Sequence, residues 1–376
     1  MTKDKLLERS IPIVVLLAGL LSLSACGGVS QTATTPPPPP CTTNCGASLG
    51  SVTNAAALSA CPTGYATGMN CWQATVVCPN TADLTVTYGY MAPLGTIKGT
   101  IFFHGGGAGD VPLGIPKFID PYTQAGYALV QMAWASSWED TGLTTKDVGV
   151  SACRPATLMN YIFQQVATSG GAKCAQGFSA GSAAVAYALS WYGASSYLDN
   201  VELLSGPVFS DIEQGCKVPS PAPLNVCAPG QFGCMGATPF LDSPSYNTGP
   251  DGSGTATGVG NITGDASCGG LATTSAQSNA NWKAMSIVNG TTTPSFSYPK
   301  TSMAGWVCSN GLNPSAAQGN IFYQQFTSTA QIADFSLNPV ANCTGAEGVD
   351  TGTVSSGESG ALAISNDMIA HCIVRH

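Results

Sequence analysis

The segment Ala172-Lys-Cys-Ala-Gln-Gly177-Phe178-Ser179-Ala180-Gly181, with the alanine-rich stretch that follows it, decides the fold. We predict a strand over 172–178 and a helix over 182–191. The pentapeptide at their junction fits G-x-S-x-G, whose small residues permit the strained strand-to-helix turn that presents a serine hydroxyl. The helix directs the positive end of its dipole toward developing negative charge. Ser179 is therefore a candidate nucleophile, and a glycine-rich helix start without chemistry is the alternative.

A second glycine-rich motif lies about 75 residues upstream. The apolar run over 98–103 predicts a buried strand, which leads into His104-Gly105-Gly106-Gly107. Together the two motifs resemble the α/β-hydrolase superfamily, closest to secreted, disulfide-rich bacterial esterases, over roughly residues 80–375. The resemblance implies that the loop with Gly105 and Gly106 supplies one oxyanion-binding amide and Ala180 the other. It also implies carboxylic-ester hydrolysis with no metal or organic cofactor. A plain glycine turn is the alternative interpretation.

The rest of the chain alternates predicted strands and helices. Further strands are expected over 84–88, 127–134, 200–205, 301–307 and 335–342, and further helices over 115–126, 149–168 and 358–375. This alternation predicts an α/β fold, a mostly parallel sheet with helices on both faces. Residues 206–300 interrupt the pattern with four cysteines among many Gly, Pro, Ser and Thr. We interpret them as a disulfide-stapled, loop-rich insertion, a candidate lid.

The partners of Ser179 depart from the order of the resembled superfamily, which is Ser, then Asp or Glu, then His. The segment 308–314, where the acid is expected, contains no carboxylate. The segment 343–350, where the histidine is expected, contains none. The chain has only three histidines, so a histidine base must be His104, His371 or His376.

In the first of three hypotheses, His371 is the base. It lies in the predicted C-terminal helix, and a disulfide through Cys372 could hold it near the sheet. A local surface pair with Asp367, four residues earlier, is the alternative. Asp211 and Asp334 are the candidates for the triad acid, and an ordinary solvated carboxylate is the simpler interpretation of each.

In the second hypothesis, Glu347 or Asp350 replaces the missing base. A carboxylate with a pKa near 4 removes a proton from a serine hydroxyl poorly, so this hypothesis requires burial to raise the pKa. In the third hypothesis, Ser179 is no longer catalytic, and the domain binds its ligand without converting it to a product.

Two tryptophans and one arginine are further candidates for the site. Trp134 and Trp138 flank the end of a predicted strand, at the edge where α/β sites open, so they could stack on a substrate ring. Packing in the core or under a lid is the alternative. We expect Arg154 to have a structural role, and binding of an acidic group is the alternative.

The N-terminus predicts export and lipid anchoring. Lys3, Lys5 and Arg9 precede an apolar run over 11–23, which suits a signal peptide and is short for a membrane span. Leu23-Ser-Ala-Cys26 resembles a bacterial lipobox, and an ordinary secretory signal is the alternative. The resemblance implies cleavage before Cys26, lipidation of that cysteine and transport to the outer membrane, because Gly27 follows it. We expect a signal peptide over 1–25, a tether over 26–57 and one domain over 58–376.

Composition narrows the classes of partner. The chain has 15 cysteines, 9% charged residues and a net charge of −8. The cysteine number indicates an oxidising compartment. Fourteen remain for disulfides if Cys26 carries lipid, and no spacing indicates a zinc site. Without a run of Lys and Arg, nucleic-acid binding is not expected. The expected partners are the membrane and a small or polymeric ester.

Overall fold

The computed structural model describes residues 47–113, 116–143, 147–168, 170–212, 276–290, 294–309, 314–326, 330–345 and 347–376. All of them belong to one compact unit, Pro40–His376. The predicted signal peptide, Cys26 and most of the predicted insertion lie outside the described residues. Within the described ranges, no helix has the length and apolarity that a membrane span requires.

One sheet of nine strands organises the described residues, in the order β1-β2-β3-β5-β4-β6-β7-β8-β9. The strands β5, β4, β6, β7, β8 and β9 run parallel to one another. Their bounds are Tyr127–Trp134, Gly99–His104, Ala172–Phe178, Asn200–Leu204, Tyr298–Cys308 and Ile332–Val340. Every residue of β4 and β7 is buried, as expected for central parallel strands covered on both faces. The predicted fold class is confirmed.

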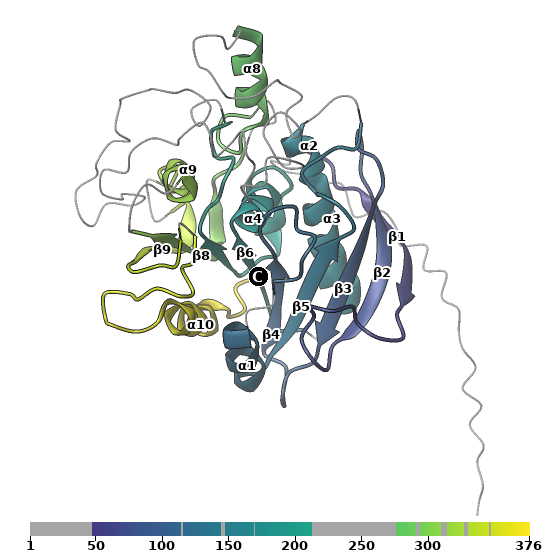
Figure 1. The fold of residues 1–376 in the computed structure, drawn as a ribbon, viewed down its shortest axis with the longest axis vertical. Helices are drawn as coiled ribbons and strands as arrows, with labels where there is room; N and C mark the ends of the chain where they lie inside the picture. The colour runs from purple at the N-terminus through teal and green to yellow at the C-terminus, as the bar shows by residue number, and fades with distance from the viewer. Residues whose placement is uncertain are drawn as a thin grey trace, which may run out of the picture. The chain divides into compact units, whose positions relative to one another are not determined.

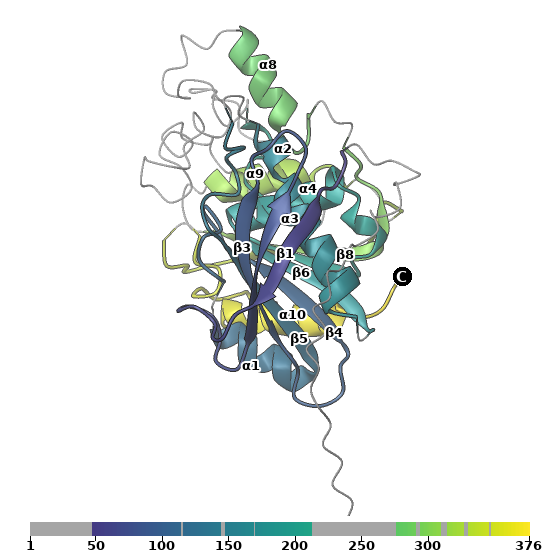
Figure 2. The ribbon, with the colours of Figure 1, turned by 90° about the vertical axis from the view of Figure 1, so that its right-hand side faces the viewer.

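Three antiparallel strands form one edge of the sheet, β1 (Ser51–Ala57), β2 (Asn70–Val77) and β3 (Leu84–Met91). Figure 2 shows them crossing the front of the molecule. Alternate residues of β3 from Leu84 to Tyr88 are buried, and so are Ala74 and Val76 of β2, which is typical of antiparallel strands with one covered face. The tether was expected to extend to residue 57. The structure corrects this boundary, because Ser51–Ala57 pairs with β2 along the sheet edge.

Helices cover both faces of the sheet (Figure 1). On one face α1 (Pro116–Ala125) and α10 (Gly360–His371) pack beside each other, over apolar side chains such as Ile101, Phe103 and Leu204. On the other face lie α3 (Cys153–Tyr161), α4 (Ala180–Ser190) and α9 (Pro314–Tyr323). The remaining helical segments are α2 (Val148–Ser151), η1 (Ile162–Val166), η2 (Ala194–Ser196) and α8 (Ala276–Met285). Helix α4 is buried all round, which suits its alanine-rich sequence.

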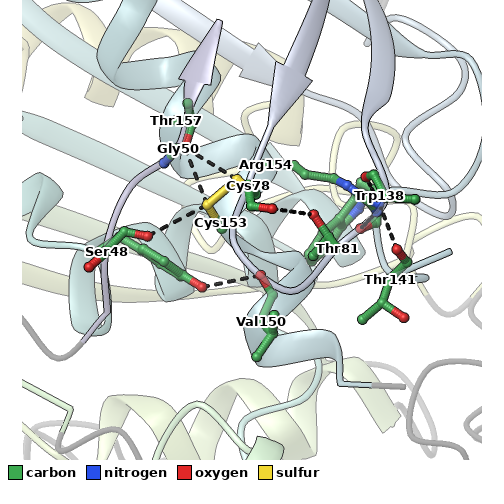
Figure 3. Close-up of a disulfide and its surroundings, with 12 residues drawn as sticks. Ser48, Gly50, Cys78, Thr81, Trp138, Thr141, Val150, Cys153, Arg154 and Thr157 are labelled. Atoms are coloured by element: carbon green, nitrogen blue, oxygen red, sulfur yellow. Dashed lines mark hydrogen bonds between the residues drawn. A yellow bond between two sulfur atoms is a disulfide. The ribbon is translucent and has the colours of Figure 1, made fainter. Parts of the chain in front are cut away.

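All eight described cysteines pair, in the disulfides Cys61–Cys71, Cys78–Cys153, Cys174–Cys372 and Cys308–Cys343. Cys78–Cys153 joins the end of β2 to the first residue of α3 (Figure 3). Beside it Thr157 Oγ1 accepts a hydrogen bond from the Gly50 N–H at 2.8 Å. The antiparallel edge is thereby fastened to the helical layer.

Arg154, next to that disulfide, is buried with 1% of its surface exposed. Its guanidinium donates to the backbone carbonyls of Ala82, Trp138, Asp140 and Thr141. These contacts hold the loop after β5 against the loop before β3. Figure 3 labels Arg154 with Trp138 and Thr141 of this group. Arg154 has the structural place that we expected for it.

Candidate active site

Ser179 lies on the sharp turn between β6 and α4. Its φ of 54° and ψ of −115° are unusual for a residue with a side chain. Such backbone costs about 1–3 kcal/mol and persists where the surroundings enforce it. Here the Ser179 N–H donates to the Leu204 carbonyl at the end of β7, at 2.8 Å. The geometry matches the elbow that the motif predicts.

The two glycines of the motif are required by close backbone contacts. A Cβ on Gly177 would lie 2.3 Å from the Gly181 carbonyl oxygen. A Cβ on Gly181 would lie 2.2 Å from the His104 carbonyl oxygen. The backbone on the two sides of the elbow is therefore in close contact. The start of α4 also lies directly against the loop that follows β4.

That loop places Gly106 directly over the elbow. A Cβ on Gly106 would lie 3.2 Å from Ser179 Cβ and 3.0 Å from Phe178 Cδ1. Within the described part of the chain, the N–H groups of Gly106 and Ala180 donate no hydrogen bond. Ala180 is the first residue of α4, so its N–H is one of the free donors at a helix start. Two free amides beside one serine form the arrangement expected of an oxyanion hole.

The His104 side chain holds the glycine loop in place. It is fully buried, and Trp134 Nε1 donates to its Nε2 at 3.2 Å. Because an indole N–H only donates, the His104 proton is on Nδ1, which lies 2.9 Å from the Gly105 carbonyl oxygen. Burial lowers the pKa of His104 to about 4. The ring is therefore neutral, and both nitrogens are engaged in holding the loop.

The tryptophans support this loop and do not line an open subsite. Trp134 and Trp138 are 2% and 0% exposed. Trp138 packs edge-on against the His104 ring at 5.8 Å between centroids. A Cβ on Gly109, whose φ is 69°, would lie within 3.0 Å of both indoles. The expectation that Trp134 contacts substrate is corrected, because its polar atom and its faces are used inside the protein.

Glu347 is the residue that the structure brings to Ser179. It lies in the loop after β9, where the superfamily pattern places a histidine. Ser179 Oγ donates to Glu347 Oε1 at 3.2 Å, and Ser315 Oγ at the start of α9 donates to the same oxygen. The backbone is held as well, because Ser205 Oγ donates to the Glu347 carbonyl at 2.6 Å. The second hypothesis predicted this pairing for Glu347 or Asp350, and it is Glu347 that makes it.

Burial raises the pKa of Glu347, and the hydrogen bonds from Ser315 and Ser179 lower it in part, so that the pKa stays above its ordinary value. This is the change that the second hypothesis required. A raised pKa brings the carboxylate closer to the range in which a general base works.

His371 lies at the opposite end of the sheet. Its Nε2 is 3.3 Å from Asp334 Oδ2, and its Nδ1 is 3.2 Å from Asp367 Oδ1. These groups line a small cavity with Asn200 and Ser302, the first paired residues of β7 with β8. Ser179 instead contacts Leu204, four residues along β7, or about 13 Å at the usual strand rise.

The prediction that His371 serves Ser179 does not fit this geometry, since a base must come within about 3.2 Å or one water. The disulfide Cys174–Cys372 does hold the end of α10 to the sheet, but at the amino end of β6. The local pair with Asp367, the alternative for His371, is present.

The other candidate groups also lie away from Ser179. Asp334 contacts His371, and Asp211 Oδ2 accepts from Asn289 Nδ2 at 2.9 Å, so neither completes a triad through a histidine at Ser179. His376 Nε2 is 3.0 Å from the Leu198 carbonyl oxygen. None of the three histidines reaches the elbow serine.

Sequence reasoning missed Ser205 and Ser315, the two serines that hold Glu347. No local motif marks either residue. The only available signal for Ser205 was its place just after the strand next to the elbow strand, where side chains meet at the carboxyl edge of a parallel sheet.

Comparisons with known proteins give structural likenesses only. No protein-family model and no curated protein matches the chain. A hyperthermophilic esterase from the archaeon Pyrobaculum calidifontis superposes with a TM-score of 0.46 at 10% identity, over 81% of this chain and 86% of that one. Carboxyl esterase 2 of Tuber melanosporum gives 0.43 at 12%, over 83% and 87%. A thermostable carboxyl esterase of Bacillus coagulans gives 0.43 at 11%, over 80% and 97%.

Proposed function

We propose that the protein is a lipid-anchored, extracytoplasmic serine hydrolase of carboxylic esters, with Ser179 as nucleophile and Glu347 as general base. One observation carries the proposal. The hydroxyl of an elbow serine donates to a carboxylate whose pKa is raised, beside two amides that donate no hydrogen bond among the described residues. A nucleophile, a base and an oxyanion hole are the parts that acyl transfer requires.

The chemistry follows from this arrangement. Ser179 Oγ attacks the ester carbonyl carbon as its proton passes to Glu347 Oε1. The N–H groups of Gly106 and Ala180 stabilise the tetrahedral oxyanion. Its collapse breaks the bond to the alcohol, which leaves with the proton from Glu347. Water then attacks the acyl-enzyme, Glu347 accepts its proton, and the acid is released as the proton returns to Ser179.

The location rests on the N-terminal sequence and the disulfides. The lipobox-like Leu23-Ser-Ala-Cys26 supports cleavage and lipidation at Cys26, and Gly27 supports the outer membrane as the destination. Four disulfides among the described residues support an oxidising compartment. Mass spectrometry of the N-terminal peptide tests the anchor: acyl chains on Cys26 are expected, and an unmodified cysteine contradicts it.

A second candidate is a binding lipoprotein on the same fold that turns nothing over. One observation favours it: each histidine is engaged elsewhere, so Ser179 lacks the usual base. The 3.2 Å Ser179–Glu347 bond favours the enzyme.

Turnover separates the two candidates. Purified full-length protein is incubated with p-nitrophenyl acetate and butyrate, with Ser179→Ala as the matched control. The hydrolase gives release of nitrophenol that depends on Ser179. Release that is equal in the wild type and in Ser179→Ala contradicts the hydrolase and leaves the binding protein.

A further inference from the structure

The Glu347 carboxylate shares one oxygen between two serines. Oε1 accepts from Ser179 Oγ, the proposed nucleophile, and from Ser315 Oγ, which is 4% exposed. From this geometry, and resting on the proposed function, we infer that Ser315 is a positioning residue. It keeps Glu347 ionised and directs Oε1 toward Ser179, and so sets the lower pH boundary of the reaction.

The position of Ser315 is fixed by the docking of α9. Tyr323 OH donates to the Gly206 carbonyl at 2.6 Å, and a Cβ on Gly319 would lie 2.4 Å from the same oxygen. Gln318 Oε1 accepts from the Asp211 N–H, and its Nε2 donates to the Asp211 carbonyl. Gln318, Gly319 and Tyr323 thus hold the second half of the helix to the segment after β7, and Ser315 lies in its first turn.

Burial and two serine hydroxyls determine the pKa of Glu347 among the described residues. Burial raises the pKa of Glu347, and the two serine hydroxyls lower it, with Ser315 the larger effect. Of the described residues, no charged side chain contributes, including Asp350 in the same loop and His104 in the glycine loop. A hydrogen bond to an ionised carboxylate is stronger than one to the neutral acid. Removing the Ser315 hydroxyl therefore favours protonated Glu347, which cannot accept the Ser179 proton.

The test follows the titration of Glu347 by infrared difference spectroscopy of its carboxyl C=O stretch. Glu347→Gln of the full-length protein assigns the band. In Ser315→Ala we expect Glu347 to titrate at higher pH than in the wild type, and Ser315→Thr to restore the wild-type midpoint. Ser309→Ala is the matched control, because Ser309 Oγ donates to the Val340 carbonyl and not to Glu347. If Ser315→Ala is unfolded, Ser315→Cys, a weaker donor of similar size, replaces it.

A second readout separates this inference from the function beneath it. The rate of labelling by a fluorophosphonate is measured against pH. We expect Ser315→Ala to lose about tenfold at acidic pH, which corresponds to about 1.4 kcal/mol, and to reach the wild-type rate on the alkaline plateau. A Glu347 midpoint in Ser315→Ala equal to the wild type overturns the role of Ser315, whether or not labelling occurs. A shifted midpoint with no labelling of Ser179 supports the role of Ser315 in positioning Glu347 and overturns the hydrolase.

Discussion

Ser179 Oγ and Glu347 Oε1 are joined by a 3.2 Å hydrogen bond between residues 168 positions apart in sequence. The bond connects the turn after β6 with the loop after β9. These are the two places from which the resembled superfamily draws its serine and its histidine. A carboxylate here occupies the place of an imidazole. The proposed reaction therefore requires that Glu347 accepts the Ser179 proton.

The pH dependence of hydrolysis reports the protonation of Glu347. Because burial holds its pKa above the ordinary value, activity is full above that raised pKa and falls as pH decreases through it. We expect this acidic fall in kcat/KM for p-nitrophenyl acetate to occur above about pH 4.3, the ordinary pKa of glutamate. His104, whose pKa is lowered by burial to about 4, is neutral over most of this range. An acidic fall that His371→Ala abolishes contradicts this assignment.

Gly106→Ala tests the oxyanion loop. The added Cβ meets Phe178 and Ser179 at 3.0–3.2 Å, so the loop has to move away from the elbow. We expect kcat to fall at least about tenfold, since one oxyanion donor contributes about a hundredfold or more. Gly107→Ala is the matched control: its Cβ meets open space, although its φ of 56° costs about 1 kcal/mol of stability. Equal activity of the two variants contradicts the placement of Gly106 in the oxyanion hole.

Glu202→Gln tests a buried carboxyl that the proposed reaction does not use. Glu202 is 0% exposed on β7, and its two carboxyl oxygens have no hydrogen-bond partner within the described residues. Burial and then the charge of Asp367 raise its pKa well above the ordinary value. As pH rises above the unfolded-state pKa, the unfolded chain loses this proton while the native state keeps it. The contribution of Glu202 to wild-type stability therefore falls with increasing pH.

The slope expected from Glu202 reaches at most about 1.4 kcal/mol per pH unit, until the native group also ionises. Urea unfolding at pH 5 and pH 8 measures it. We expect Glu202→Gln to lose less stability than the wild type between these values. Equal losses in the two proteins show that Glu202 does not carry the effect.

The disulfide Cys78–Cys153 is expected to stabilise the antiparallel edge. It closes a loop of 75 residues, for which chain entropy predicts about 4 kcal/mol. Thermal unfolding of the double variant Cys78→Ala/Cys153→Ala should show a loss of that order. Both cysteines are buried, so part of the loss reflects packing. A melting temperature equal to the wild type contradicts the role of this bond.

The sequence predicted the parts of the fold that depend on local signals. The elbow, the glycine loop and the parallel strands follow from short motifs and apolar runs whose meaning does not depend on distant residues. The edge strands β1 and β2 were missed because neither shows a regular alternation: β1 is almost wholly exposed, and β2 buries Cys71, Ala74 and Val76. Pairing with a neighbouring strand, which composition does not report, decides such segments.

The sequence predicted only those parts of the candidate site that depend on local backbone geometry. The positions of Ser179 and of the Gly106 and Ala180 amides follow from local backbone geometry. The base depends on which loop the topology brings to the elbow, so Glu347 and His371 could not be separated by sequence. The disulfide through Cys372 was expected to hold His371 near the sheet. It does, but at the amino end of the strands, away from Ser179.

The most direct test is fluorophosphonate labelling of the full-length protein, with the adduct located by peptide mass spectrometry. We expect labelling on Ser179 that is lost in Ser179→Ala. We also expect a rate reduced about a hundredfold or more in Glu347→Gln, because the amide cannot accept the proton, and a wild-type rate in His371→Ala. Labelling that survives in Glu347→Gln and disappears in His371→Ala contradicts the proposed role of Glu347.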